Sequence, residues 1–327
     1  MKKIFSFLIL ILLICGCEKE EPKIEITFDD NYYQVATPYK ESVGNYSINS
    51  YDKEEVETML MDISNDYFKI NNSLYQEGQY LTSEEIKELV NQYNKTETIE
   101  VDNIKIKPQY ITSIYEQNYL ATNNSLKGIS LAIVVDNKQY YSDNSYKIID
   151  EKIVLDYAKK QTLELIKYMR NKEELQHINI VVGIYLQNNN LKGSFKYVGY
   201  SENEKIKFDF VNYNYQKLDS NYVMNNDINT YNNVLNLKKS LNQYNNIYTS
   251  YTGLYKDNTL LNIDIIVNSD YFNKGQILNI SNTITKDLNS FPQNVNIKIY
   301  IKTSNEVKAF LNKEDNVNKI NTYILEE

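Results

Sequence analysis

Apolar residues recur every three or four positions in several segments of the chain, which is the spacing of one buried helix face. In the first of these segments the shared face is formed by Val56, Leu60, Ile63 and Tyr67. Ser83 comes just before a similar stripe and suits the cap at which a helix begins. The pattern predicts helices over residues 53–70, 83–93, 151–170, 230–245 and 274–289.

Runs of β-branched and aliphatic residues lie between these segments and are typical of buried strands. They predict strands over residues 129–135, 178–186, 261–267 and 295–302, with flanking strands near 110–119 and 247–255. Asn123-Asn124-Ser125 and Lys256-Asp257-Asn258 separate paired strand signals. Because Asn and Asp favour tight turns, we expect a hairpin at each of these two places.

The predicted elements occur in the same order twice. Residues 110–187 and 247–303 each give strand, turn, strand, helix and strand. We therefore expect an α+β fold with two related ββαβ lobes, mixed or antiparallel sheets and flanking helices, although unrelated α+β proteins also show such alternation. A predicted hairpin over 193–211 extends the first unit, and Asn-rich 219–232 is the candidate linker. The expected lobes cover residues 24–218 and 219–327.

The amino terminus has the pattern of an export signal. Met1-Lys2-Lys3 is basic, and residues 4–14 are almost continuously apolar, which suits a signal-peptide core and is too short to span a bilayer comfortably. Ile14-Cys15-Gly16-Cys17 matches a bacterial lipobox. Signal peptidase II is then expected to cut between Gly16 and Cys17 and to remove residues 1–16. The alternative is an ordinary signal peptide with two incidental thiols.

Cys17 is the predicted lipidation site, because Cys15 follows a bulky residue where a small one is needed. Diacylglycerol on Cys17 would anchor the chain stably, since two or three acyl chains exceed the marginal affinity of one. Residues 17–23 suit a short solvated tether. No later segment approaches about eighteen consecutive apolar residues. We expect a lipid-anchored protein on the outer face of the cytoplasmic membrane of a Gram-positive-type bacterium, matured by lipoprotein-processing enzymes.

Composition excludes several classes of function. The 327 residues are 42% hydrophobic and 24% charged, so the body folds as a globular protein. The net charge is −8 and Arg170 is the only arginine, which argues against nucleic-acid binding. A single histidine, His177, and two early cysteines leave no cluster for a metal centre, and no glycine-rich phosphate loop occurs. We expect no metal, cofactor or nucleic acid.

Two short sequence patterns imitate catalytic motifs. Gly128-Ile129-Ser130-Leu131-Ala132 approaches a nucleophile elbow, with Asp156 and His177 later in the hydrolase order. An elbow needs a helix after its serine, whereas Ser130 lies near the start of a predicted strand. His177 suits a polar residue at a strand end instead.

The second pattern imitates penicillin-binding serine acyltransferases. Its elements are Ser50-Tyr51-Asp52-Lys53, Ser142-Asp143-Asn144 and Lys302-Thr303-Ser304. The third element lacks its glycine, and Ser50 is also explained as a helix N-cap. This enzyme requires Ser50, Lys53, Ser142 and Lys302 to cluster; we expect no enzyme and no catalytic residue.

Tyrosine is abundant, at 31 residues against 10 phenylalanines and no tryptophan. Exposed tyrosines could form an adhesive or glycan-stacking surface, the candidates being Tyr32, Tyr33, Tyr140, Tyr141, Tyr213 and Tyr215. The alternative is genome composition, since Asn, Lys, Ile and Tyr rise together while Arg, Gly, Pro and Trp fall. This second explanation covers every residue type at once and is favoured.

Motifs along the chain resemble the CamS sex-pheromone lipoprotein family of Gram-positive bacteria. They are Tyr32-Tyr33, Pro38-Tyr39-Lys40, Tyr67-Phe68, Gln76-Glu77-Gly78-Gln79-Tyr80-Leu81, Ser113-Ile114-Tyr115-Glu116-Gln117-Asn118-Tyr119, Lys127-Gly128, Ile180-Val181-Val182-Gly183-Ile184-Tyr185, Gly193-Ser194-Phe195 and Phe291-Pro292. The resemblance implies an extracytoplasmic lipoprotein whose signal peptide releases a short hydrophobic mating pheromone, from within Phe7 to Gly16, to a peptide receptor. It implies no chemistry for the folded body. An alternative function is binding of a ligand or the cell wall in a cleft between the lobes.

Overall fold

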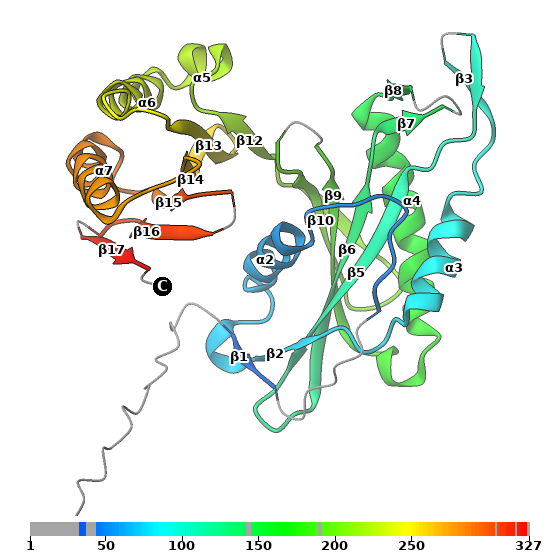
Figure 1. The fold of residues 1–327 in the computed structure, drawn as a ribbon. Helices are drawn as coiled ribbons and strands as arrows, with labels where there is room; N and C mark the ends of the chain where they lie inside the picture. The colour runs from blue at the N-terminus through cyan, green and yellow to red at the C-terminus, as the bar shows by residue number, and fades with distance from the viewer. Residues whose placement is uncertain are drawn as a thin grey trace, which may run out of the picture.

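The computed structural model describes residues 33–36, 44–101, 103–141, 145–188, 191–304, 306–317 and 319–325. Two lobes follow one another along the chain, each built on one large sheet (Figure 1). The expected signal peptide, Cys17 and the tether lie outside the described residues. Within the described part of the chain, no helix is both long and apolar enough to cross a bilayer.

The first sheet has seven strands and the second has six. In spatial order the first contains β1 (Gln34–Val35), β2 (Leu74–Glu77), β5 (Ile111–Leu120), β6 (Leu126–Val135), β9 (Asn179–Leu186), β10 (Ser194–Ser201) and β11 (Lys207–Phe210). The second contains β12 (Tyr213–Lys217), β13 (Tyr248–Lys256), β14 (Thr259–Asn268), β15 (Asn296–Lys302), β16 (Val307–Lys313) and β17 (Ile320–Ile324). Two small hairpins are β3 (Ile99–Val101) with β4 (Ile104–Ile106) and β7 (Lys138–Tyr140) with β8 (Tyr146–Ile148).

The helices lie between these strands in the chain. They are α2 (Lys53–Ser64), α3 (Ser83–Tyr93), α4 (Glu151–Arg170), α5 (Asn221–Asn226), α6 (Ile228–Leu241) and α7 (Lys274–Asp287). Short 3₁₀ turns cover Ile70–Asn72, Glu173–Leu175 and Leu288–Ser290.

The two sheets share one topology at their centres. In the first, β5 and β6 are antiparallel, helix α4 crosses over, and β9 returns parallel to β6. In the second, β13 and β14 are antiparallel, helix α7 crosses over, and β15 returns parallel to β14. An antiparallel strand follows each unit, β10 in the first and β16 in the second. The expected α+β fold with two related ββαβ lobes is confirmed.

The first lobe has three layers. Helices α3 and α4 pack their apolar stripes on one face of the sheet, around Ile129, Leu131 and Ile133 of β6. Helix α2 covers the opposite face, where Ala132 and Val134 of the same strand point. Because both faces are covered, every residue of β5 is buried.

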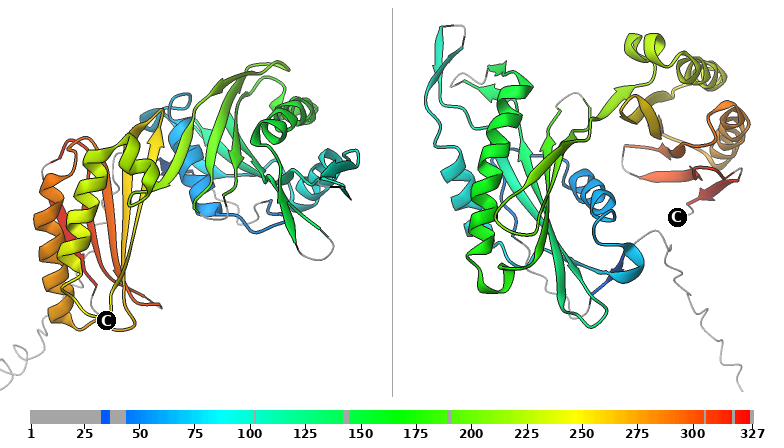
Figure 2. Two further views of the ribbon diagram at one scale, coloured as in Figure 1. Left: turned by 90° about the horizontal axis from the view of Figure 1, so that it is seen from above. Right: turned by 180° about the vertical axis from the view of Figure 1, so that it is seen from behind.

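The second lobe covers only one face of its sheet with helices. Figure 2 shows α6 and α7 side by side on that face, where they contact each other and bury Ile263, Ile265 and Val267 of β14. The alternate residues of β14 point the other way and are only partly buried. Buried and partly buried residues therefore alternate along β14 because helices cover only one face of its sheet.

Several boundaries differ from those expected. The helix expected over 53–70 ends at Ser64, since the Asn65 side chain accepts a hydrogen bond from the Ile70 N–H and turns the chain. Phe68 thereby enters the core beside Tyr119, with ring centroids 4.9 Å apart. Residues 219–232, expected as a linker, form α5 and the start of α6, and β12 already belongs to the second sheet.

Candidate functional site

A buried carboxylate on α2 joins the two lobes. Glu55 accepts hydrogen bonds from the Tyr215 hydroxyl on β12 and from Lys192 Nζ, the latter at 2.8 Å. Lys192 Nζ also lies 3.4 Å from Asp264 Oδ2 on β14. Tyr215 and Leu254 of the second sheet pack in the same apolar cluster as α2. A polar network inside an apolar contact therefore fixes how the lobes meet.

The charges in this junction change the titration of its members. Burial raises the pKa of the Tyr215 hydroxyl well above its usual value, and the neighbouring Glu55 carboxylate raises it further. Burial opposes the charged form of Lys192, but Glu55 and Asp264 outweigh it and raise the lysine pKa. At neutral pH the junction thus holds a cation between carboxylates of the two lobes.

Lys196 holds the chain where it passes from one sheet to the other. It lies at a bulge of β10, and its buried ammonium donates to the Tyr213 carbonyl at 2.8 Å and to the Asn214 amide oxygen. Ser194 Oγ donates to the same Tyr213 carbonyl at 2.7 Å. Burial lowers the pKa of Lys196. The start of β12 is therefore tied directly to the first sheet.

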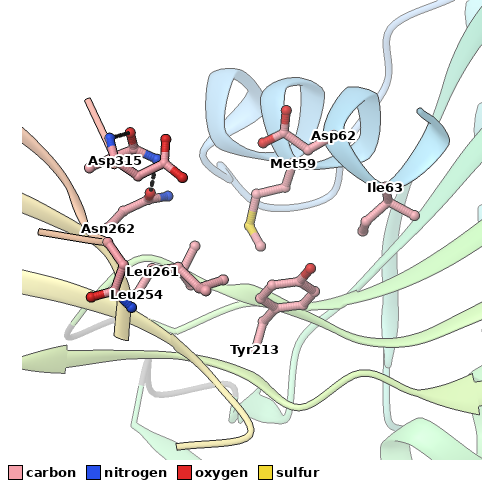
Figure 3. Close-up of a pocket in the computed structure, with 10 residues that line it drawn as sticks. Met59, Asp62, Ile63, Tyr213, Leu254, Leu261, Asn262 and Asp315 are labelled. Atoms are coloured by element: carbon pink, nitrogen blue, oxygen red, sulfur yellow. Dashed lines mark hydrogen bonds between the residues drawn. The ribbon is translucent and has the colours of Figure 1, made fainter. Parts of the chain in front are cut away.

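A cavity of about 260 Å³ opens beside this junction (Figure 3). Its lining comes from both lobes: Met59, Asp62 and Ile63 on α2, then Tyr213, Leu254, Leu261, Asn262, Asn294, Asn296 and Asp315. One side is apolar, formed by Met59, Leu254 and Leu261. The other side is polar, and hydrogen bonds among its own residues hold them in place. Asn296 Nδ2 donates to Asn262 Oδ1 at 3.2 Å, and the Asp315 N–H donates to Asn296 Oδ1 at 2.9 Å.

Asp62, one of two carboxylates that line this cavity, has a raised pKa. Part of its side chain reaches solvent, yet the protein surface on either side of it displaces water and raises its pKa to about 6. Lys298 on β15 opposes the shift, and Glu55, about two turns earlier on α2, adds to it. Asp62 thus changes its charge in mildly acidic solution.

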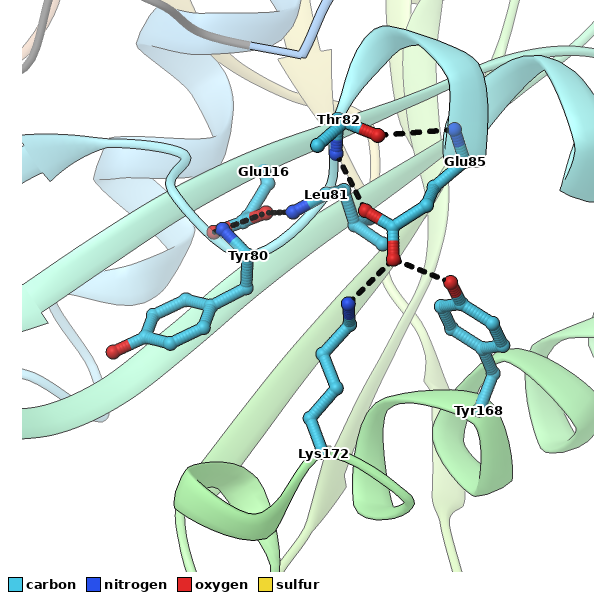
Figure 4. Close-up of polar contacts among 7 residues, drawn as sticks. All are labelled: Tyr80, Leu81, Thr82, Glu85, Glu116, Tyr168 and Lys172. Atoms are coloured by element: carbon cyan, nitrogen blue, oxygen red, sulfur yellow. Dashed lines mark hydrogen bonds and ion pairs between the residues drawn. The ribbon is translucent and has the colours of Figure 1, made fainter.

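Two of the sequence motifs meet at another buried carboxylate (Figure 4). Glu116 on β5 accepts from the backbone N–H of Gln79 at 2.8 Å, of Tyr80 at 3.0 Å and of Leu81 at 2.8 Å. Burial raises the pKa of Glu116, and these three hydrogen bonds work against the rise. A Cβ atom on Gly78 would lie 2.8 Å from the Cβ of Glu116. The 76–81 motif therefore fits closely around the 113–119 motif.

Most of the chain matches the model of a known protein family. The model of the CamS sex pheromone cAM373 precursor matches residues 40–319. The chain belongs to the CamS family. Membership implies an extracytoplasmic protein. No curated protein matches the chain.

Solved structures of CamS proteins share the fold. A sex pheromone precursor from Lactobacillus salivarius subsp. salivarius UCC118 has a TM-score of 0.74 at 20% identity, over 84% of this chain and 87% of that one. The C-terminal domain of the sex pheromone staph-cAM373 precursor from Staphylococcus aureus has a TM-score of 0.71 at 19% identity, over 85% of this chain and 98% of that one. At this identity the likeness concerns the fold alone.

The acyltransferase residues are not brought together among the described parts of this CamS chain. Ser50 lines a second cavity of about 340 Å³ in the first lobe, and Asp52, not Ser50, is the N-cap of α2. Lys53 Nζ lies over the Tyr115 ring at 5.5 Å. Lys302 ends β15, where it pairs with β14 and β16. Ser142 lies outside the described residues.

The hydrolase pattern is dispersed as well. Ser130 is fully buried within β6, and its hydroxyl lies 2.6 Å from that of Ser64. Asp156 pairs with Lys159 at 2.7 Å on α4, and His177 is exposed after the 3₁₀ turn that follows. The described residues contain no group of three or more metal-ligating side chains.

The expectation that Tyr33 and Tyr215 are exposed is wrong, since their exposed fractions are 7% and 9%. Both hydroxyls donate hydrogen bonds, Tyr33 to the Phe68 carbonyl and Tyr215 to Glu55. Tyr140 is 50% exposed, and Tyr32 lies outside the described residues. Many tyrosines therefore serve as core residues with a polar end that needs a partner.

Most residues that line the junction cavity were not singled out from the sequence, although Tyr213 was named as a candidate surface tyrosine and Ile63 as part of a helix stripe. One signal was present: in β14, polar Asn262 and Asp264 alternate with buried Ile263 and Ile265. This alternation indicates a second sheet face with polar side chains. It carries no information about which element of the first lobe lies opposite.

Proposed function

We propose that this CamS-family chain is exported, cut before Cys17 and anchored by lipid on the outer face of the cytoplasmic membrane. The lipobox that ends at Cys17 carries this proposal, because it follows a basic segment and an apolar core of signal-peptide length. The family match begins at residue 40, which leaves a short segment after Cys17 to serve as a tether. Family membership supports an extracytoplasmic place for the body.

The anchor is tested by replacing single cysteines and fractionating cells. Cys17→Ala should leave an uncut precursor and abolish labelling by a radioactive fatty acid. Cys15→Ala is the matched control and should be cut and labelled like the parent. A signal peptidase II inhibitor should reproduce the Cys17→Ala pattern in the parent. Normal processing in the presence of the inhibitor would contradict the lipobox.

We further propose that the removed segment yields a short hydrophobic pheromone from within Phe7 to Gly16. The support is the family itself, whose members are described as sex pheromone precursors. Mass spectrometry of culture medium should detect a peptide that ends at Gly16, and its synthetic copy should induce mating in recipient cells that carry a receptor. Absence of both the peptide and the response would refute this part. Processing at Cys17 could still be normal.

For the folded body we propose binding rather than catalysis, with the junction cavity as the site. The observation that favours it is a recess with one apolar and one polar side, formed only where the two lobes meet. Its volume of about 260 Å³ lies just below the range of about 300–1,000 Å³ for drug-sized ligands. It therefore suits one small polar molecule, such as a single sugar or a wall fragment of that size.

Calorimetric titration with N-acetylglucosamine and with glucosamine tests this site. The two sugars have similar size, and the cationic one should bind more tightly above pH 6 because of Asp62. Leu261→Trp should fill the recess and abolish binding, whereas Leu278→Trp, on an exposed position of α7, should not. Equal binding by both variants would exclude the cavity.

A further inference from the structure

The second sheet carries a row of aromatic side chains across three neighbouring strands. Tyr300 on β15 is the register partner of Phe310 on β16, and Phe310 is the partner of Tyr323 on β17. The ring centroids are 5.1 Å apart in the first pair and 6.2 Å apart in the second. The Phe310 and Tyr323 rings are nearly parallel, at 20°. We call Tyr300, Phe310 and Tyr323 the aromatic row.

This row lies on the sheet face that α6 and α7 do not cover. Ile299 and Ile301, on either side of Tyr300 in β15, are fully buried against those helices, so Tyr300 points away from them. The same alternation applies to Phe310, which lies between buried Ala309 and Leu311. Figure 1 shows both helices beyond the sheet on the side away from α2. Tyr323 is 53% exposed, and the other two rings are partly exposed.

A row of polar side chains runs beside the aromatic row, two residues nearer the first lobe. Lys298 pairs with Asn312, and Asn312 pairs with Asn321. The two rows are about 7 Å apart, because a strand rises about 3.3 Å per residue. Lys298 is engaged electrostatically with Asp62 of the first lobe, which leaves two uncharged amides beside the rings. Lysines also flank the rings: Lys302 follows Tyr300 on β15, and Lys308, which pairs with Glu306, precedes Phe310 on β16. The face thus combines flat apolar rings with amides and a few lysines.

We propose that this face binds an extended, uncharged glycan strand. The C–H face of a pyranose ring packs on an aromatic ring, and its hydroxyls exchange hydrogen bonds with amides such as Asn312 and Asn321. An open, shallow row across three strands suits a polymer better than a single small molecule. None of the three rings lines the junction cavity, so this site is separate from the one proposed above.

Two features favour a glycan over the other polymers. A peptide that adds to a sheet needs free backbone groups, but β15 and β16 are paired on both sides, so Tyr300 and Phe310 would take no part in such pairing. An anionic polymer needs an excess of cations, whereas two of the lysines near the rings face carboxylates: Lys298 lies opposite Asp264, and Lys308 pairs with Glu306. The ring faces and amides together fit a neutral polyhydroxyl chain.

Titration of the full-length chain, kept in mild detergent, with the tetramer of N-acetylglucosamine tests the proposal. The parent should bind, and Phe310→Ala should bind about tenfold more weakly, as expected for one lost stacking contact. Tyr323→Ala, at the exposed edge of the sheet, should weaken binding similarly without a risk to the core. Tyr271→Ala is the matched control, since this tyrosine of the same lobe is 72% exposed and outside the row.

Three outcomes would overturn the glycan site. These are failure of the parent to bind the tetramer, equal affinity in Tyr323→Ala and Tyr271→Ala, or equally strong binding of a tetra-alanine peptide that competes with the sugar. Leu261→Trp should keep tetramer binding, because it fills the cavity and leaves the row intact. Loss of binding in Leu261→Trp together with normal binding in Tyr323→Ala would place the tetramer in the cavity and refute the row.

Discussion

The hydroxyl of Tyr215, in the sheet of the second lobe, donates a hydrogen bond to the Glu55 carboxylate on α2 of the first lobe. The two residues are 160 positions apart in the chain. Glu55 is buried, and its other oxygen accepts from Lys192 at 2.8 Å. The pair shows that the second lobe completes a polar site that the first lobe cannot satisfy alone.

Tyr215→Phe removes one hydrogen bond from this buried carboxylate and little else. We expect a loss of about 1.5–3 kcal/mol in the free energy of unfolding, as for hydrogen bonds to charged groups. Urea denaturation followed by circular dichroism measures it. Tyr213→Phe, on the same strand, is the control and should change stability by less. Equal stability of the two variants would show that Lys192 alone satisfies Glu55.

Gly78→Ala should destabilise the first lobe because the new methyl group would meet Glu116 at 2.8 Å. Overpacking of this kind costs about 1–3 kcal/mol. Gly275→Ala, in the first turn of α7, is the comparison: its methyl group would meet only the Asn273 side chain, at 3.3 Å, and alanine favours the helix. Thermal unfolding should show that Gly78→Ala is less stable than Gly275→Ala. A stable Gly78→Ala protein would mean that Glu116 can move aside.

The substitution Arg170→Lys tests what the only arginine of the chain contributes to stability. The buried guanidinium donates to the carbonyls of Leu175 at 2.6 Å, Ser201 at 3.1 Å and Ile178, and so joins the end of α4 to the next strands. A lysine cannot reach all of these acceptors, and we expect a loss of about 2–3 kcal/mol. Lys160→Arg, on the exposed side of α4, should be neutral in the same denaturation assay.

Glu85 predicts a pH dependence of stability. Partial burial opposes its charge, but Lys172, the Thr82 N–H and the Tyr168 hydroxyl outweigh burial and lower its pKa to about 2 (Figure 4). Since the folded pKa lies below the unfolded value of 4.5, this stabilisation is present above pH 4.5 and is lost as pH falls toward 2.

Glu85→Gln should therefore cost about 1–2 kcal/mol at pH 7 and progressively less below pH 4.5. Glu84→Gln, at the exposed neighbouring position, should differ little from the parent at either pH. Denaturation curves at pH 7 and pH 3 measure both. A cost that is constant across this range would show that the carboxylate charge is not what matters.

Asp62 predicts a pH dependence of stability with the opposite sign. Its folded pKa of about 6 lies above the unfolded value of 3.8, so the folded state loses stability as pH rises from about 4 to 6. Asp62→Asn should therefore stabilise the protein at pH 7.5 and have little effect at pH 4. Asp66→Asn, just beyond the end of α2, serves as the control. Stabilisation that does not depend on pH would contradict the titration of Asp62.

The local pattern of apolar, polar and turn residues was enough to predict most helices and strands. Helix α3 covers the predicted residues 83–93, although Thr82 is its cap. The hairpin between β13 and β14 turns at Asp257 and Asn258, both with positive φ, as Asp and Asn in such a turn allow. Periodicity and turn chemistry act over a few residues, so one sequence contains them in full.

The candidate sites depend on contacts that periodicity does not encode. The apolar stripe of α2 predicts that Leu60 and Ile63 lie near a core, but not that Met59 and Asp62 beside them face a second lobe. Glu116 and Gly78 stand in separate motifs, and only their spatial contact explains both. Tyrosine abundance suggested a surface or a biased genome, whereas ten of the described tyrosines are buried: Tyr33, Tyr75, Tyr93, Tyr110, Tyr115, Tyr119, Tyr185, Tyr215, Tyr251 and Tyr255.

The long sequence separation between Glu55 and Tyr215 also sets an order of events during synthesis. Helix α2 is synthesised long before Lys192 and Tyr215. The Glu55 carboxylate therefore has neither of these hydrogen-bond partners at first. A charge of this kind is costly to dehydrate alone. The contact between α2 and the second lobe therefore forms only after β12 has been made, and until then the side of α2 that carries Glu55 has no second sheet to cover it.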